Sequence, residues 1–242
     1  MYYTNHVELI ESFINVQQRV IMIHRFFIAF LLIFGNDLAH TGPVWPDTFS
    51  VEFHEILYGL LITYGENEGK WYYDYTNNRA RFDHLNGQTD NFCQGQGLSP
   101  RHPFDDCHLL FSPDTAMYVH YPNAQTCCRL CAAGIGCTPL KPDWLLNVTM
   151  EGTEQVEDRE CKVYHVQGAV AQDYWMDTMD DVPCRYYESL PEEHPIFFHN
   201  LTFYPETYTT DPIDEAIFDI PDYCYKDCPN PYTPPDAKYS IF

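Results

Sequence analysis

Residues 49–54 (FSVEFH) and 70–76 (KWYYDYT) carry the pattern that decides the fold class of this 242-residue chain. In both segments, aromatic or branched apolar residues occupy every second position, with polar residues between them. This period of two is typical of a β-strand that is buried on one face. The two apolar faces consist of Phe49, Val51, Phe53, Trp71, Tyr73 and Tyr75.

The chain around these segments predicts a meander of antiparallel strands. Apolar residues change phase after Glu55, which suggests a bulge near His54 and Glu55. A turn is expected at residues 66–69 (ENEG) and another at Asn77-Asn78. Further strands are expected at 107–111, 116–121, 144–150, 160–170 and 196–204, whereas 124–140 could hold one helical turn pinned by disulfides. The chain is therefore expected to be an all-β, mainly antiparallel protein.

The composition excludes two classes of protein. Thirteen Lys and Arg residues against 35 Asp and Glu residues give a formal charge of −22. Binding to nucleic acid requires a basic surface, so we expect no nucleic-acid partner. An aromatic content of 16% supplies ample surface for a core, which argues against an acidic disordered chain.

The N-terminal region resembles a secretory leader. Residues 26–34 (FFIAFLLIF) are apolar, and His24 and Arg25 precede them. Nine apolar residues are too few for a membrane-spanning helix, which needs roughly 20. We therefore expect a signal-peptide region at residues 1–40, with translation starting at Met1 or Met22, and no stable transmembrane segment. A buried core helix is the alternative. A single secreted domain is expected at 41–242, with a Pro- and Tyr-rich tail from about residue 229.

The cysteines also favour an oxidising compartment, either extracellular or the endolysosomal lumen. Their number is even and all follow the leader, as a disulfide framework predicts. Zinc is the alternative, because Cys128 and Cys131 have ligand-like spacing. Cys127 and Cys128 are adjacent and should pair with different partners, but the pairing as a whole is undetermined. The ten are Cys93, Cys107, Cys127, Cys128, Cys131, Cys137, Cys161, Cys184, Cys224 and Cys228.

Two sequons and two acidic clusters suggest surface chemistry. Asn147 and Asn200 each begin an N-x-T triplet and are candidate glycosylation sites. The acidic clusters are a candidate Ca²⁺ site or solvated loops, and no metal ligand can be assigned from them. They comprise Asp177, Asp180, Asp181, Asp211, Asp214, Glu215 and Asp219.

Motifs for catalysis are absent. Residues 54–58 (HEILY) differ from the zinc motif H-E-x-x-H because Tyr58 stands at the second histidine, and they follow a strand pattern rather than a helix. The sequence contains no nucleophile elbow and no phosphate-binding loop. We therefore expect no enzyme, no organic cofactor and no catalytic residue. A secreted hydrolase with an unfamiliar site remains an alternative.

The order of several short motifs resembles the ependymin-related proteins in their broad sense, including divergent protist and plant forms. The similarity spans roughly residues 45–228. The motifs are Trp45-Pro46-Asp47-x-Phe49, Gly69 to Tyr75, Arg79-x-Arg81, Asn91-Phe92-Cys93, Cys127-Cys128-x-x-Cys131, Pro142 to Leu145, Gly168 with Tyr174-Trp175, Pro183-Cys184-Arg185 and Phe218-x-Ile220-Pro221-x-x-Cys224.

This resemblance implies a secreted or lysosome-like glycoprotein with a LolA-like fold, in which two curved antiparallel sheets form a half-open barrel around a hydrophobic pocket. It also implies that some members dimerise and bind calcium, and the family is not known as enzymes. Combined with the aromatic strands, it predicts a lipid-like ligand between the sheets. Phe49, Val51, Phe53, Trp71, Tyr73 and Tyr75 are the expected lining. A calcium-dependent extracellular adhesion or matrix protein is the alternative. The resemblance also makes a homodimer a candidate assembly of this chain.

Overall fold

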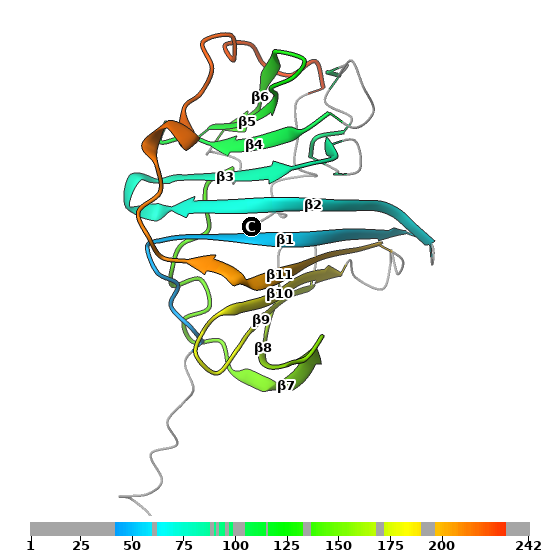
Figure 1. Cartoon of the computed structure of the whole chain (residues 1–242), viewed down its shortest axis with the longest axis vertical. Helices are drawn as coiled ribbons and strands as arrows, with labels where there is room; N and C mark the ends of the chain where they lie inside the picture. The colour runs from blue at the N-terminus through cyan, green and yellow to red at the C-terminus, as the bar shows by residue number, and fades with distance from the viewer. Residues whose placement is uncertain are drawn as a thin grey trace, which may run out of the picture. The chain divides into compact units, whose positions relative to one another are not determined.

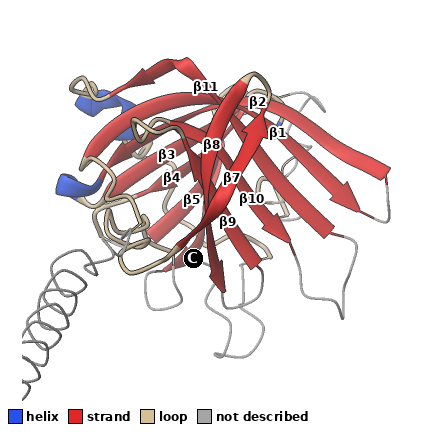
Figure 2. Cartoon of the chain, turned by 90° about the horizontal axis from the view of Figure 1, so that it is seen from below, coloured by secondary structure: helices blue, strands red, loops and turns tan. Residues whose placement is uncertain are grey.

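One curved antiparallel sheet of eleven strands forms the fold (Figures 1 and 2). The structure is a computed structural model, and it describes residues 42–59, 62–87, 90, 92–94, 97–98, 105–114, 116–132, 137–167, 172–189 and 197–230. The strands are β1 (Thr48–Gly59), β2 (Ile62–Asp74), β3 (Arg79–His84), β4 (Cys107–Phe111), β5 (Ala116–Tyr121), β6 (Thr126–Ala132), β7 (Met150–Val156), β8 (Arg159–Gln167), β9 (Gln172–Asp177), β10 (Pro183–Ser189) and β11 (Phe197–Thr209).

Two meanders make up this sheet. The strand order is β6-β5-β4-β3-β2-β1-β11-β10-β9-β8-β7, so β1 to β6 form one half and β7 to β11 form the other. Pairing of β1 with β11 joins the halves into a continuous hydrogen-bonded surface. The prediction of an all-β, antiparallel, half-open fold is confirmed. The two expected sheets are the two halves of one sheet.

The local predictions around β1 and β2 were wrong in two places. The register of β1 with both neighbours is continuous across His54 and Glu55, so no bulge lies there. β2 runs through residues 66–69, where a turn was expected. Asn67 is buried there, and its side-chain amide exchanges hydrogen bonds of 3.1 and 2.9 Å with the backbone of Asn86. A residue type that is typical of turns thus forms buried hydrogen bonds within a long strand.

Other segments divide in the same way. The strands at 107–111 and 116–121 are confirmed, and those at 160–170 and 196–204 correspond to β8 and β11 with different ends. Residues 144–147 form turns, so the strand expected at 144–150 was wrong except at its end, where β7 begins. In the cysteine-dense segment, Thr126–Ala132 forms strand β6, and residues 133–136 lie outside the described residues. The turn at Asn77-Asn78 is confirmed, because the 3-10 helix η1 (Tyr75–Asn77) ends at Asn78 in the left-handed conformation.

The concave face of the sheet carries the main hydrophobic core. Inward-facing residues of β1, β2 and β11 pack around Trp45, whose ring lies 5.3 Å from Trp71 and 4.7 Å from Trp175 between centroids. Gly69 lets the Phe53 ring pack against β2, because a Cβ at this position would meet Phe53 Cζ at 2.4 Å. The segment that precedes β1 is therefore folded into the hollow of the sheet.

Five disulfides confirm the predicted framework and account for all ten cysteines. The adjacent Cys127 and Cys128 pair with Cys224 and Cys228 respectively, which fastens the C-terminal segment to β6. The other pairs are Cys93–Cys107, Cys131–Cys137 and Cys161–Cys184. Since every sulfur is bonded to another sulfur, cysteine ligation of zinc is excluded.

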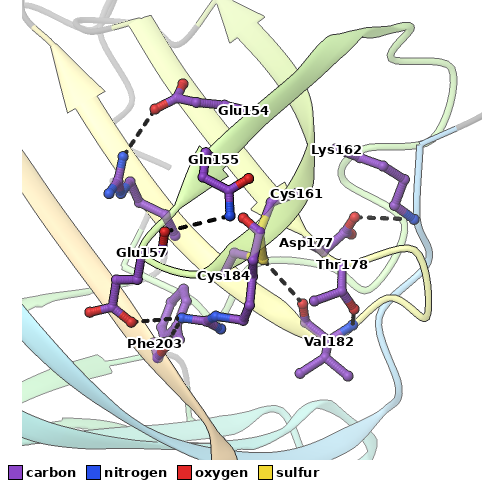
Figure 3. Close-up of a disulfide and its surroundings, with 12 residues drawn as sticks. Glu154, Gln155, Glu157, Cys161, Lys162, Asp177, Thr178, Val182, Cys184 and Phe203 are labelled. Atoms are coloured by element: carbon purple, nitrogen blue, oxygen red, sulfur yellow. Dashed lines mark hydrogen bonds and ion pairs between the residues drawn. A yellow bond between two sulfur atoms is a disulfide. The ribbon is translucent and has the colours of Figure 1, made fainter.

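Figure 3 shows the Cys161–Cys184 bridge with its polar neighbours. The bridge lies in a second, smaller core with Val156 and Met176. Beside it, Lys162 Nζ lies 3.1 Å from a carboxylate oxygen of Asp177 and also pairs with Asp181. Two of the three aspartates in the acidic cluster at residues 177–181 thus pair with a lysine. In the second cluster, Asp214 caps the 3-10 helix η4 (Glu215–Phe218).

The expected leader at residues 1–40, its alternative start at Met22 and the tail beyond residue 230 lie outside the described residues. Within the described ranges, no helix has the length and apolar character needed to cross a membrane.

Candidate functional site: a cavity in the concave face

A cavity remains between the concave face of the sheet and the segments folded over it. It offers about 80 Å³ to the centres of water-sized molecules. One water needs roughly 10–15 Å³ by this measure, so the space exceeds a packing defect. Its lining comes from β1 to β5, from β9 to β11, from Trp45, Asp90 and Phe92, and from residues 138–140.

The body of the cavity is apolar and aromatic. The lining residues of this kind are Trp45, Trp71, Tyr73, Ala80, Phe82, Phe92, Leu109, Phe111, Met117, Pro139, Leu140, Trp175, Tyr186, Leu201 and Phe203. Tyr73 fixes the cover of the cavity, since its hydroxyl donates a 2.7 Å hydrogen bond to the Leu140 carbonyl oxygen. The indole N–H groups of Trp45 and Trp71 are buried and have no hydrogen-bond partner.

One part of the wall is polar and buried. Inward positions of β1, β3, β10 and β11 and the segment after β3 bring together five side chains, which we name the carboxylate–imidazole cluster. Its members are Glu55, His84, Asp90, Glu188 and His199. All but Glu188 line the cavity.

His199 is the fixed centre of one half of the cluster. Its Nε2 lies 2.6 Å from Glu55 Oε1 and its Nδ1 lies 3.2 Å from Glu188 Oε2. Burial works to lower the pKa of His199, but the hydrogen bonds to the two carboxylates outweigh it and raise the pKa to about 10. His199 is therefore an imidazolium that donates from both nitrogens.

His84 occupies the other half. Its Nε2 lies 3.7 Å from both Glu55 Oε2 and Asp90 Oδ2, which is too far for a hydrogen bond. Burial raises the pKa of Asp90 to about 6, although His84 opposes this shift. Burial also works to raise the pKa of Glu55, but His84 and His199 outweigh it and hold that pKa below its ordinary value. The cavity thus has an apolar body and a strongly charged end.

The six residues that were expected to line a ligand site differ in their positions relative to the cavity. Trp71 and Tyr73 line the cavity. Phe49, Val51 and Phe53 are buried in the same core but are not among the lining residues. Tyr75 lies in η1, partly buried and stacked on Tyr73. Ligand binding by these residues stays a prediction.

The candidate glycosylation sites differ in exposure. Asn147 is exposed in a turn with a φ of 70°. Asn200 lies within β11, partly buried, and its side-chain oxygen has no hydrogen-bond partner.

Sequence reasoning missed the carboxylate–imidazole cluster entirely. Glu55 stands at an inward position of β1, directly in phase with Phe49, Val51 and Phe53. Glu55 interrupts this apolar series, and alternation alone predicts a change of phase at that point. The glutamate at an otherwise apolar position is the one signal in the sequence that could have indicated the site.

Comparison with known proteins gives a likeness of fold only. No family model and no curated protein matches the chain. Solved structures that resemble it include an uncharacterised conserved protein from Thermus thermophilus, with 12% identity, a TM-score of 0.41, and coverage of 71% of this chain and 86% of that one. A putative outer membrane lipoprotein-sorting protein domain from Vibrio parahaemolyticus has 7% identity, a TM-score of 0.38, and coverage of 71% and 89%.

A LolA superfamily protein from Nitrosomonas europaea has 10% identity, a TM-score of 0.33, and coverage of 73% of this chain and 93% of that one. These structural neighbours include LolA-superfamily proteins, and none of the matches supports the ependymin resemblance specifically. At these similarities the function has to be argued from the residues of this chain.

Proposed function

We propose that the protein binds an apolar small molecule or a lipid chain in the cavity of the concave face and catalyses no reaction. The observation that supports this is the cavity itself, whose body is almost entirely aromatic and aliphatic. Burying apolar surface contributes about 25 cal/mol per Å², so an apolar molecule gains free energy by leaving water for this space. Preformed apolar cavities with a few polar groups are typical of ligand sites.

A non-enzymatic role is supported by the chemistry of the polar end. Among the described residues, no hydroxyl or thiol group is hydrogen-bonded to His84 or His199, because both rings face carboxylates. A nucleophile paired with a general base is therefore missing from the geometry around these rings.

Binding of N-phenyl-1-naphthylamine, an uncharged dye that brightens in apolar surroundings, tests the proposal. We expect saturable binding of one dye per chain, and a natively purified sample should release an apolar molecule on organic extraction. Ala80→Leu should reduce dye affinity at least tenfold, because Ala80 lines the cavity. Met176→Leu in the smaller core is the matched control and should leave affinity unchanged. An unsaturable dye signal, or equal affinity in the Ala80 variant, would contradict the proposal.

We further propose that the chain is an exported glycoprotein related to the ependymins. Five disulfides support export, since they persist in oxidising compartments. Asn147 is the favoured glycan site because it is exposed, whereas Asn200 lies within a strand. Peptide N-glycosidase should lower the mass of the protein by one glycan, and Asn147→Gln should abolish that change.

A further inference from the structure

Two carboxylates of the carboxylate–imidazole cluster each place one oxygen near the same ring nitrogen of His84. His84 Nε2 lies 3.7 Å from Glu55 Oε2 and 3.7 Å from Asp90 Oδ2. Ligand atoms at 2.0–2.2 Å from a tetrahedral ion are about 3.3–3.6 Å apart. The observed spacing exceeds a hydrogen bond but is within a few tenths of an ångström of that ligand spacing.

The two carboxylates are held in place through their other oxygens. Glu55 Oε1 accepts the 2.6 Å hydrogen bond of His199, and Asp90 Oδ1 accepts backbone N–H bonds of 2.9 and 2.7 Å from Phe92 and Cys93. Each carboxylate therefore keeps one oxygen for a further ligand. In metal sites, hydrogen bonds to one oxygen of a carboxylate orient the other oxygen toward the ion.

The three side chains are buried, and two of their atoms lack partners. Among the described residues, Glu55 Oε2 and the second ring nitrogen of His84, Nδ1, have no hydrogen-bond partner. The side chains of Glu55, His84 and Asp90 are 1%, 4% and 2% exposed. An unpaired polar atom at such depth costs about 1–3 kcal/mol, which a bound ion would remove.

The charge of the cluster favours a divalent ion. Three carboxylates carry three negative charges, and the doubly hydrogen-bonded His199 carries one positive charge. A divalent ion bound to neutral His84 would neutralise the two negative charges that this leaves. Uncompensated buried charge is strongly unfavourable.

We propose that Glu55, His84 and Asp90 bind one divalent transition-metal ion of the Zn²⁺ class at the polar end of the cavity. An imidazole with two carboxylates suits Zn²⁺, whereas Ca²⁺ takes six to eight oxygens. The Cys93 sulfur lies within 4.8 Å of the His84 and Asp90 donors, but its disulfide with Cys107 removes it as a thiolate ligand. All three residues line the cavity, so a molecule bound there would lie close to the ion.

Titration calorimetry with ZnCl₂ on chelator-treated, untagged protein tests the site. We expect the tightest binding event to have a stoichiometry of one Zn²⁺ ion per chain. Co²⁺ should produce a visible absorption band at the same stoichiometry. Glu55→Gln, Asp90→Asn and His84→Gln should each lower the Zn²⁺ affinity by about 100-fold or more. His165→Gln is the matched control, because His165 forms a surface pair with Glu151 at 3.2 Å and should not alter binding.

A measurement on the unmodified protein covers the case in which a variant does not fold. In ¹H–¹⁵N spectra of the histidine rings, the first equivalent of Zn²⁺ should shift the ring nitrogens of His84. Absence of a one-to-one complex, an unshifted His84 ring, or tighter binding of Ca²⁺ than of Zn²⁺ would each overturn the assignment. If the three variants fold and bind Zn²⁺ as tightly as the unmodified protein does, the assignment would also be overturned.

Discussion

Filling the cavity by Ala80→Leu is the most direct test of whether the concave face encloses usable space. Ala80 is 2% exposed on β3 and lies on the same face as Phe82 and His84. All three line the cavity. A leucine at this position adds three carbon atoms, and a space of about 80 Å³ for the centres of water-sized molecules holds them without displacing neighbours.

The expected effect on stability follows from the added apolar surface. Each buried carbon contributes about 0.8 kcal/mol, giving about 2.4 kcal/mol for three. Ordering the leucine side chain costs about 0.5–1 kcal/mol. The variant should therefore be more stable by about 1.5 kcal/mol, which for a protein of this size raises Tm by about 3–6 °C.

Thermal and urea unfolding of the ligand-free protein measure this difference, with the disulfides kept intact. Ala116→Leu is the matched control, because Ala116 is 4% exposed on β5 and is not among the cavity-lining residues. Adding three carbons there should overpack the core and cost about 1–3 kcal/mol. The two alanine variants are thus expected to change stability in opposite directions.

A loss of stability in Ala80→Leu as large as that in Ala116→Leu would refute the reasoning. It would mean that side chains around Ala80 already fill the space, and the proposed ligand site would lose its basis. A gain of stability accompanied by loss of dye binding would show that the leucine and the dye occupy the same volume.

Three further predictions follow from other parts of the molecule. Burial raises the pKa of Asp173 to about 7, so its ionisation destabilises the fold as pH rises from about 4 to 7. Asp173→Asn should therefore stabilise the protein by up to about 4 kcal/mol at pH 8 and by almost nothing at pH 4, as measured by urea unfolding. Gly69→Ala should cost about 1–3 kcal/mol in the same assay, because its Cβ would meet Phe53 Cζ at 2.4 Å and a backbone oxygen at 2.2 Å. Replacing Cys161 and Cys184 together by alanine should cost about 3 kcal/mol, because their bridge spans a sequence separation of 23. An unchanged denaturation midpoint at pH 8 would contradict each of these predictions.

Alternation and residue type were sufficient to predict much of the sheet. β4 and β5 are short and strongly apolar in sequence, and both of their ends agree with the prediction. The adjacent Cys127 and Cys128 predicted separate partners because a bond between neighbours is strained. These features depend on local sequence, which is why they could be predicted.

The segments that were missed obey long-range constraints instead. β6 contains three cysteines and an arginine, and it is a strand because it pairs with β5 and is fastened to the C-terminal segment. β7 carries mostly polar, exposed residues and gains its structure from pairing with β8. Neither segment has an apolar period of its own, so pairing partners distant in sequence determine the fold there.

The cluster at the polar end of the cavity shows the same limit at the level of a site. Glu55 and His199 are 144 residues apart, and they meet only because β1 pairs with β11. An isolated glutamate within an apolar strand predicts either a register change or a buried charge, and alternation alone cannot distinguish the two. Burial decides between them physically, since a carboxylate at an inward position requires partners. Strand pairing supplies His199 on one side, and the end of β3 supplies His84 on the other. An inward glutamate in a strand of an aromatic sheet therefore indicates a polar site, and its partners should be sought on the strands that pair across it.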